Sequence, residues 1–293
     1  MKHQCIDANR AHYPVRLLCS ALRVSVSGYY ARQSRAPSAR SQRHAILTRR
    51  IEAIHHASHA TYGAPRIHAE LRAQREPCCK NTVARLMHKA GIVPKTVRRF
   101  RVTTDSRHTR ASPNLLGRVF TAAQPNDCWL TDITFIPTRA GWLYLAAMLD
   151  LYSRAIVGWA MRERMDGQLV MNALNMALAR RGAAPDILHS DQGSLYAMAE
   201  YRALLSKQGI RQSMSRKADC WDNAPMESFF HTLKTELVMH CDYQTREQAR
   251  SSLFEYMEVF YNRERRHSSL NYASPLDFEA MHRPLIEAST KRG

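Results

Sequence analysis

The sequence predicts an α/β protein, in which a mixed five-stranded sheet with helices on both faces follows an all-α, basic region. From about residue 126 onward, apolar or alternating runs of strand length are interspersed with helical patterns, which is typical of a sheet covered by helices. The first hundred residues show helical periodicity only. Hydrophobic residues make up 45% and charged residues 23% of the chain, as in folded globular proteins.

The all-α part contains two short helix-turn-helix-like patterns. The first lies within residues 1–40, which end in a basic linker rich in Ser and Arg. The second occupies residues 41–95, and its last helix, predicted over 80–90, buries an i, i+3, i+4, i+7 stripe and ends at Gly91. Residues 96–122 lack periodicity, so we expect a basic linker there.

Positive charge is concentrated in this all-α part. Residues 1–110 hold 22 Lys and Arg against 5 Asp and Glu, whereas residues 111–293 hold 21 against 20. Such a one-sided excess of positive charge suits the binding of a polyanion, and nucleic acid is the favoured partner. The alternative is a basic surface that only keeps the protein soluble. The predicted DNA-contacting residues here are Lys80, Asn81, Arg85, Arg98 and Arg99.

The remaining chain divides into a core at 123–240 and a C-terminal helix with a basic tail at 241–293. In chain order we predict antiparallel strands at 128–137, 142–150 and 153–161, a helix at 166–181, a strand at 185–191, a helix at 197–208, a strand at 210–215 and helices at 222–240 and 245–262. The cluster Arg263, Arg265, Arg266 and His267 is read either as a phosphate contact or as a solvated tail.

The order of elements indicates that three carboxylates are candidate functional residues. Asp132 lies inside an apolar strand, where an unpaired carboxylate is costly, and Asp191 ends the fourth strand, where ligands often bind. Glu227 lies on the following helix, in a polar stripe with Asn223, His231 and Lys234. Three carboxylates meeting at the strand ends would suit two divalent hard cations and phosphoryl transfer. His189, next to Asp191, is more simply read as structural.

These residues resemble a known family. Asp132 and Asp191 are separated by 58 residues, Asp191 and Glu227 by 35, and Lys234 stands seven after Glu227. This spacing resembles the D,D(35)E transposases and retroviral integrases. More closely, the chain resembles the second-frame protein of insertion sequences of the IS-three family, through YGAPRIHAEL (62–71), TDIT (131–134), LHSDQGS (188–194), SRKADCWDNAPMESFFHTLKTEL (215–237) and YNRERRHSSLNYASPLDF (261–278).

The resemblance implies a ribonuclease H-like core and a two-metal chemistry. Asp132, Asp191 and Glu227 would bind two Mg²⁺ ions, for which Mn²⁺ would substitute. The expected reaction is cleavage at an element end to free a 3'-hydroxyl, followed by attack of that hydroxyl on another phosphodiester. Lys234 would hold a phosphate or terminal base, and Asn223 would orient a carboxylate or DNA, with capping of its helix as the alternative.

The resemblance also implies partners. These are the terminal inverted repeats and the target DNA, a second copy of the chain in a homodimer or higher oligomer, and a fusion partner from an upstream reading frame. No apolar run approaches the roughly 20 residues of a membrane span, so a cytoplasmic, nucleoid-associated protein is expected. Two alternatives stay open: a catalytically silent DNA-binding repressor, and a ribonuclease H-like nuclease acting on hybrids.

Overall fold

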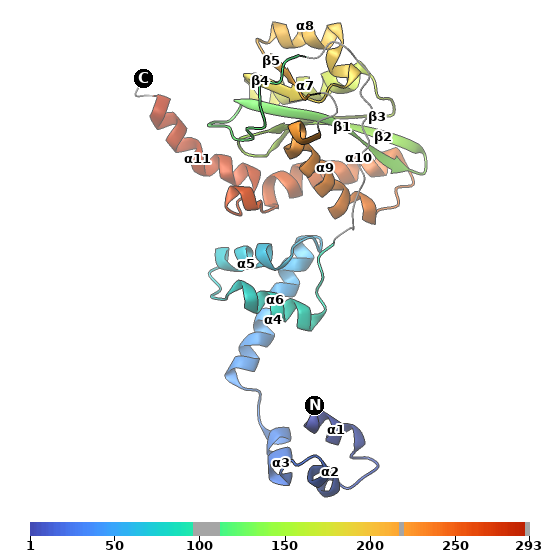
Figure 1. Ribbon diagram of the computed structural model, residues 1–293, viewed down its shortest axis with the longest axis vertical. Coiled ribbons are helices and arrows are strands. Elements are labelled where there is room, and N and C mark those ends of the chain that lie inside the picture. The colour runs from blue at the N-terminus through green and yellow to red at the C-terminus, as the bar shows by residue number, and fades with distance from the viewer. Residues whose placement is uncertain (96–111, 217–219, 291–293) are drawn as a thin grey trace.

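The computed structural model describes residues 1–95, 112–216 and 220–290, and it has two helical units followed by a sheet domain (Figure 1). The first unit contains α1 (Lys2–Asn9), α2 (Val15–Ala21) and α3 (Val26–Ser34), and the second contains α4 (Ala39–Ala57), α5 (Ala64–Ala73) and α6 (Lys80–Ala90). Helix α1 was not predicted, because only Ile6 of its residues is buried and a single buried position gives no periodicity. Helix α6 ends as predicted at Gly91, whose φ of 68° is left-handed.

The sheet domain contains five strands in the order β3-β2-β1-β4-β5. The strands are β1 (Cys128–Thr138), β2 (Gly141–Asp150), β3 (Ile156–Arg162), β4 (Ile187–Ser190) and β5 (Arg211–Met214). Strands β1, β2 and β3 form the predicted antiparallel meander, while β4 runs parallel to both β1 and β5. The sheet is therefore mixed, as predicted.

Helices cover both faces of this sheet. One face is covered by α7 (Gly167–Arg181) and α8 (Ala199–Lys207) (Figure 1). The other face is covered by α9 (Ala224–Glu236) and α10 (Arg246–Phe254). Helix α10 continues as the π-helical η4 (Glu255–Glu264). The 3-10 turns are η1 (Ser194–Ala197), η2 (Cys220–Asn223), η3 (Val238–His240) and η5 (Ser268–Leu270), and α11 (Pro275–Thr290) follows. The predicted fold class, an α/β domain after an all-α region, is confirmed.

Helix α7 lies close against β3 at Gly158. A Cβ atom at this position would stand 2.5 Å from the Ala173 carbonyl oxygen and 2.6 Å from the Ala177 Cβ. Only a residue without a side chain permits this approach, so Gly158 sets the distance between the helix and the sheet.

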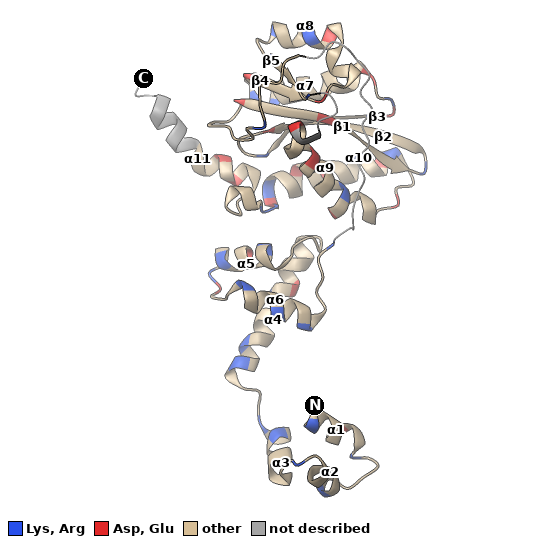
Figure 2. Ribbon diagram, in the orientation of Figure 1, with Lys and Arg blue, Asp and Glu red and all other residues tan. Residues whose placement is uncertain are grey.

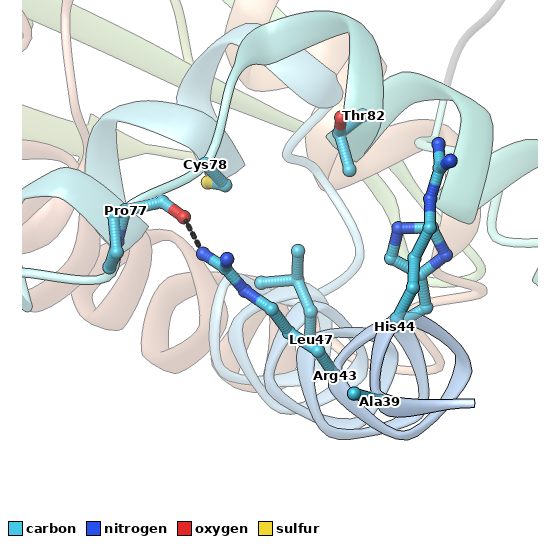
Figure 3. Close-up of a pocket in the computed structure, with 8 residues that line it drawn as sticks. Ala39, Arg43, His44, Leu47, Pro77, Cys78 and Thr82 are labelled. Carbon is cyan, nitrogen blue, oxygen red and sulfur yellow. Dashed lines mark hydrogen bonds between the residues drawn. The ribbon is translucent and has the colours of Figure 1, made fainter. Parts of the chain in front are cut away.

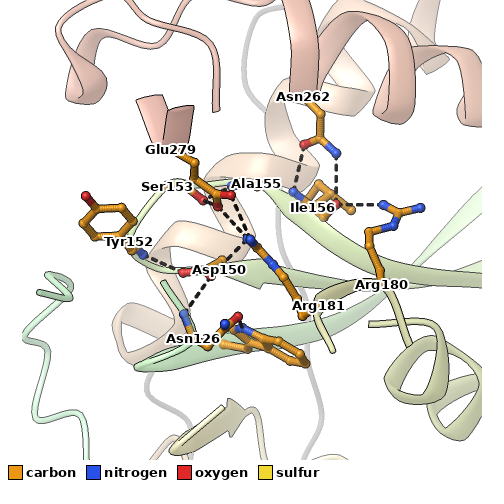
Figure 4. Close-up of polar contacts among 11 residues, drawn as sticks. Asn126, Asp150, Tyr152, Ser153, Ala155, Ile156, Arg180, Arg181, Asn262 and Glu279 are labelled. Atoms are coloured by element: carbon orange, nitrogen blue, oxygen red, sulfur yellow. Dashed lines mark hydrogen bonds and ion pairs between the residues drawn. The ribbon is translucent and has the colours of Figure 1, made fainter. Parts of the chain in front are cut away.

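Helix α11 occupies part of the region where the sequence predicted a basic tail. Arg181 at the end of α7 donates to Glu279 of α11 over 2.8 Å and to the buried Asp150 over 3.1 Å (Figure 4). Ser153, in the turn between β2 and β3, also donates to Glu279. These contacts attach α11 to the sheet domain.

Within the C-terminal basic cluster, Arg265 is neither a phosphate contact nor part of a solvated tail. This side chain is buried and donates to both oxygens of Glu236, with distances of 2.8 and 2.7 Å. Arg266 donates its backbone N–H to the hydroxyl of Tyr62 over 2.8 Å and its guanidinium to Glu70. Two of the predicted surface cations therefore hold the sheet domain together and attach the second helical unit to it.

Candidate active site

Asp132 lies on β1 just beyond the part of that strand that pairs with β4. The β1–β4 register ends at the pair Leu130 and His189, whereas the pairing of β1 with β2 continues to Thr138. Along β1, Leu130 and Ile136 lie in the apolar cluster beneath α9, so the alternation of side chains directs Asp132 to the same face. The edge of β1 that faces β4 is therefore open at Asp132.

Asp191 follows the last residue of β4. Since β1 and β4 are parallel and Leu130 is level with His189, two further residues along each strand bring Asp132 and Asp191 to the same level. Each carboxylate accepts a backbone N–H, from Ile133 over 2.7 Å and from Gly193 over 2.8 Å. The strand pairing thus places two carboxylates side by side at the sheet edge.

Glu227 stands in the first turn of α9, whose start is attached to β1 by Asn223. The Asn223 side chain is buried and donates to the Thr131 carbonyl over 3.3 Å. It makes no side-chain cap bond to α9, so the helix-capping alternative is wrong. Its bond to Thr131 places Asn223 beside the residue that carries the Asp132 carboxylate, and its action on a carboxylate or on DNA stays a prediction. Asn223 therefore fixes the first turn of α9 against the strand that carries Asp132.

The pKa values of the three carboxylates are all raised. Burial, then the charges of Asp191 and Glu227, raise the pKa of Asp132 to about 8, while the Ile133 N–H and the Lys234 ammonium oppose that rise. Burial raises the pKa of Asp191, against the Gly193 N–H, and burial raises the pKa of Glu227. Three partly buried acids that repel one another form a site that a cation would stabilise.

The donor set of this site fits a hard divalent cation. Carboxylate oxygens are the ligands that Mg²⁺ prefers, and all three groups come from different elements directed to one sheet edge. Among the described side chains, which are those of residues 1–95, 112–216 and 222–282, no three His, Cys, Asp or Glu are placed closely enough to hold a metal ion as they stand. The side chains would therefore have to move toward one another to share an ion.

Lys234 reaches the open edge of β1 from two turns further along α9. Its ammonium lies 4.9 Å from the centroid of the Phe135 ring, and it interacts electrostatically with Asp132. Burial lowers the pKa of Lys234, and the Asp132 carboxylate opposes that shift. The predicted phosphate-binding cation is thus adjacent to the carboxylates.

Asp222 is a buried anchor whose role the sequence analysis missed. It accepts hydrogen bonds from the side chains of Arg216 over 3.0 Å, Arg118 over 3.0 Å and Asn114 over 2.8 Å. The Arg216 hydrogen bond is the main reason why the pKa of this carboxyl is well below its usual range. Asp222 joins Asn114 and Arg118, which precede the sheet, to the start of α9. The sequence signal for this role was its position directly before Asn223.

His189 has a structural role, as the sequence predicted. The ring is fully buried, with Nδ1 2.8 Å from the Ser213 hydroxyl and Nε2 3.2 Å from the Ser215 hydroxyl. Burial lowers the pKa of His189, so the ring is held neutral between β4 and the end of β5.

The predicted DNA-contacting residues of the second helical unit lie on an exposed basic surface. Lys80, Asn81 and Arg85 are exposed on α6, and lysine and arginine residues occur along α4 and α6 (Figure 2). Arg98 and Arg99 lie outside the described residues. The exposed positions fit helix α6 as the second helix of a helix-turn-helix.

A shallow cavity of about 440 Å³ separates α4 from the start of α6 (Figure 3). Its rim includes Arg40, Arg43 and His44, and Arg43 donates to the Pro77 carbonyl over 2.6 Å. Burial, followed by the charges of Arg85 and other nearby cations, lowers the pKa of His44. This rim therefore carries positive charge.

Family models match three parts of the chain. A model described as "HTH-like domain" matches residues 41–100, and two described as "Integrase core domain" match residues 122–220 and 227–282. In the part of the chain that the structure describes, no helix is long and apolar enough to cross a membrane.

The chain is also similar to curated proteins over most of its length. It is 43% identical to "Insertion element IS600 uncharacterized 31 kDa protein" of Shigella sonnei, over 89% of this chain and 97% of that protein. It is 41% identical to "Transposase InsF for insertion sequence IS3A" of Escherichia coli, over 95% of this chain and 98% of that protein. A chain of the solved structure "CryoEM structure of simian T-cell lymphotropic virus intasome in complex with PP2A regulatory subunit B56 gamma" has 15% identity and a TM-score of 0.47, covering 78% of this chain and 74% of that chain. The resemblance found in the sequence is confirmed, and the chain belongs to the IS3 (IS-three) family of insertion-sequence transposases.

Proposed function

We propose that this transposase cleaves DNA at the ends of its insertion sequence and transfers the freed 3'-hydroxyl to another phosphodiester by a two-metal mechanism. The observation that carries the proposal is the position of Asp132, Asp191 and Glu227. They come from β1, the end of β4 and the first turn of α9, at one open sheet edge where burial, and then the charges of Asp191 and Glu227, raise the pKa of Asp132. Such a group is suited to cations that contact a phosphate.

In this proposal the protein positions the reacting groups. Asp132 and Asp191 are each oriented by one backbone N–H, and Glu227 is carried by a helix attached to β1 through Asn223. The three carboxylates would hold two Mg²⁺ ions, or Mn²⁺ in their place, which would activate the attacking oxygen and stabilise the leaving one. No covalent intermediate with the enzyme is required. Lys234 would bind a phosphate next to the cleaved bond.

DNA recognition is assigned to the second helical unit. The exposed Lys80, Asn81 and Arg85 of α6 would contact the terminal inverted repeat, and the cations around the cavity at α4 would contact the phosphate backbone. This division leaves the sheet domain to act on the strand that is cut. Transposition joins two element ends, so we propose a homodimer or a higher oligomer on DNA.

The test uses labelled duplexes that carry the inverted repeats flanking the gene. The purified chain is incubated with Mg²⁺ or Mn²⁺ beside the Glu227→Gln variant. Glu200→Gln is a matched control, because Glu200 stands in the first turn of α8 but is exposed there. We expect the wild type and Glu200→Gln to produce a nick with a 3'-hydroxyl at the repeat tip, and Glu227→Gln to produce none.

Three other results would count against cleavage of the element ends by this chain alone. Binding that is retained without nicking, even when the product of the upstream reading frame is added, would support the repressor. Nicking that appears only with that product would show that the chain needs its fusion partner. Cutting of the RNA strand of a hybrid, with no action on repeat tips, would support the hybrid nuclease.

A further inference from the structure

Two aromatic side chains form an exposed ledge at the hairpin between β1 and β2. Phe135 is 49% exposed and Trp142 is 50% exposed, and their rings meet edge to face with centroids 5.0 Å apart. Among the ring pairs in the described parts of the chain, this is the pair in which both rings are exposed. We call Phe135 and Trp142 the aromatic ledge. Exposed apolar surface of this kind commonly marks a binding site.

The aromatic ledge is connected to the proposed catalytic carboxylates through Lys234 at the open edge of β1. Phe135 is three residues beyond Asp132, so the alternation that directs Asp132 toward α9 directs Phe135 to the other face of β1, in the part of the strand that pairs with β2 and not with β4. The Lys234 ammonium lies 4.9 Å from the Phe135 centroid and also interacts with the Asp132 carboxylate. One cation is therefore shared between the site and the aromatic ledge.

This arrangement matches the chemistry of a nucleotide. A nucleotide carries a flat π-system and, a short distance away, a negatively charged phosphate. Aromatic side chains stack on bases of any sequence, and a neighbouring cation binds the backbone phosphate. A base that is paired inside a duplex cannot present its face to a ring, so the base must be unpaired or turned out of the stack.

We propose that the aromatic ledge stacks an unpaired base of the substrate DNA next to the cleaved phosphodiester, while Lys234 binds the adjoining phosphate. This inference rests on the proposed function, and it adds the group that holds the DNA end in place. Phe135 is the stacking residue, and Trp142 supports its ring from the side.

The first experiment detects contact without requiring cleavage. 5-Iododeoxyuridine is placed at successive positions around the repeat tip, the complex with the Glu227→Gln variant is irradiated, and the crosslinked residue is identified by mass spectrometry. We expect a crosslink to Phe135 or Trp142 from one or two positions, which disappears when Phe135→Ala is added. Crosslinks that never reach the aromatic ledge, or an absence of DNA binding, would overturn the inference.

The second experiment separates stacking from a structural role. Stacking on one base predicts that Phe135→Ala lowers the single-turnover cleavage rate roughly 5- to 150-fold on intact DNA. Removing the stacked base, by an abasic nucleotide, should lower the wild-type rate by a similar factor and leave Phe135→Ala with little further loss. Phe135→Tyr keeps the ring and should keep the rate.

A matched control is available elsewhere in the sheet domain. Phe254 is also half exposed and meets Trp159 edge to face at 5.9 Å, but it lies on α10 against β3, away from the open edge of β1. Phe254→Ala should cleave like the wild type. Equal losses for Phe135→Ala on intact and abasic DNA would mean that the ring only stabilises the hairpin. Because the abasic comparison is made with the wild type as well, the test holds even if Phe135→Ala folds poorly.

The failure of this inference can be told apart from the failure of the proposed function. If the wild type and Glu227→Gln cleave equally, the three-carboxylate mechanism is wrong, whatever Phe135 does. If the wild type cleaves, Glu227→Gln does not, and Phe135→Ala equals the wild type on every substrate, only the aromatic ledge is wrong. Protection of the aromatic ledge by a second copy of the chain in the absence of DNA would also overturn it.

Discussion

Two kinds of carboxylate lie inside the sheet domain, and they differ in the groups that donate hydrogen bonds to them. Asp222 and Glu236 each accept from arginine side chains, which are Arg118 and Arg216 for the former and Arg265 for the latter. The described hydrogen bonds to the side chains of Asp132 and Asp191 come from one backbone N–H each. The first kind is neutralised within the fold, whereas the second retains a repulsion that a ligand can relieve.

The comparison shows how structural and functional charge are separated in this chain. Asp222, which directly precedes Asn223, and Asp132 lie close to the same helix start, yet their pKa values shift in opposite directions. Hydrogen bonds from Arg216 and Arg118 lower the pKa of Asp222, whereas burial, and then the charges of Asp191 and Glu227, raise the pKa of Asp132. The carboxylates that serve the fold are paired with arginine, whereas those that we propose to bind metal keep a repulsion that a cation would relieve.

The largest expected effect is on cleavage. Asp132→Asn should lower the cleavage rate at least about 1000-fold, because the cation site loses a charged ligand. The melting temperature should stay the same or rise, since the substitution also removes like-charge repulsion. Cleavage assays and thermal unfolding of the same preparation check both. A large loss of stability would place Asp132 among the structural carboxylates.

The reverse pattern is expected at Glu236. Glu236→Gln leaves the buried Arg265 without its charged partner, and breaking such a pair costs about 3–5 kcal/mol of unfolding free energy. Urea denaturation measures this loss, with the exposed Glu200→Gln as the control. A cost below 1 kcal/mol would contradict the structural role assigned to this pair.

The pH dependence of stability should separate the two kinds of carboxylate. The pKa of Asp132 is raised from 3.8 to about 8, so the folded state holds the proton more tightly, and its contribution to stability is lost as the pH rises from about 4 to about 8. The pKa of Asp222 is lowered, so its contribution is present at neutral pH and is lost on acidification below 3.8.

Variants make this pH test specific. In metal-free buffer, Asp132→Asn should remove the loss of stability toward pH 8, and Asp222→Asn should remove part of the loss at acidic pH. Thermal melts of both variants and the wild type from pH 3 to pH 9 measure the difference. Identical profiles for the two variants would show that the carboxylates do not differ as described.

The smallest expected effect concerns the attachment of the second helical unit. Glu70→Gln weakens its contact with Arg266, in which both side chains are partly exposed, so a loss of about 0.5–1 kcal/mol is expected. Denaturant unfolding of the full chain detects it. Cleavage should change little, because neither Glu70 nor Arg266 belongs to the proposed carboxylate site; a loss comparable to that of Asp132→Asn would show that the attachment controls the site.

Most of the sheet domain was predictable from the sequence. The meander, the two parallel strands and the helices between them follow from apolar periodicity, and the strand order places Asp132 next to Asp191. The spacing of Asp132, Asp191 and Glu227 in the sequence predicts a shared site, and the strand register brings Asp132 and Asp191 to the same level. Their roles stay predictions until cleavage is measured.

What the sequence did not reveal depends on contacts between distant segments. The pairing of Arg265 with Glu236 joins residues that are 29 positions apart, and that of Arg266 with Glu70 joins residues 196 apart. A run of cations looks the same in sequence whether it faces solvent, DNA or a buried acid. Helix α11 was missed for a similar reason, since it is attached by the ion pair of Glu279 with Arg181 and by ring contacts of Phe278 and His282 with Tyr152, which give no regular apolar stripe.

The central claim is that the carboxylates at the open edge of β1 hold cations against the cleaved phosphate. The most direct test replaces a non-bridging oxygen of that phosphate with sulfur, because Mg²⁺ binds sulfur poorly and Mn²⁺ binds it well. We predict that one phosphorothioate isomer blocks cleavage with Mg²⁺ and that Mn²⁺ restores it, while Asp132→Asn is inactive with either metal. Equal rates for both isomers with Mg²⁺, or a block that Mn²⁺ does not relieve, would contradict the account.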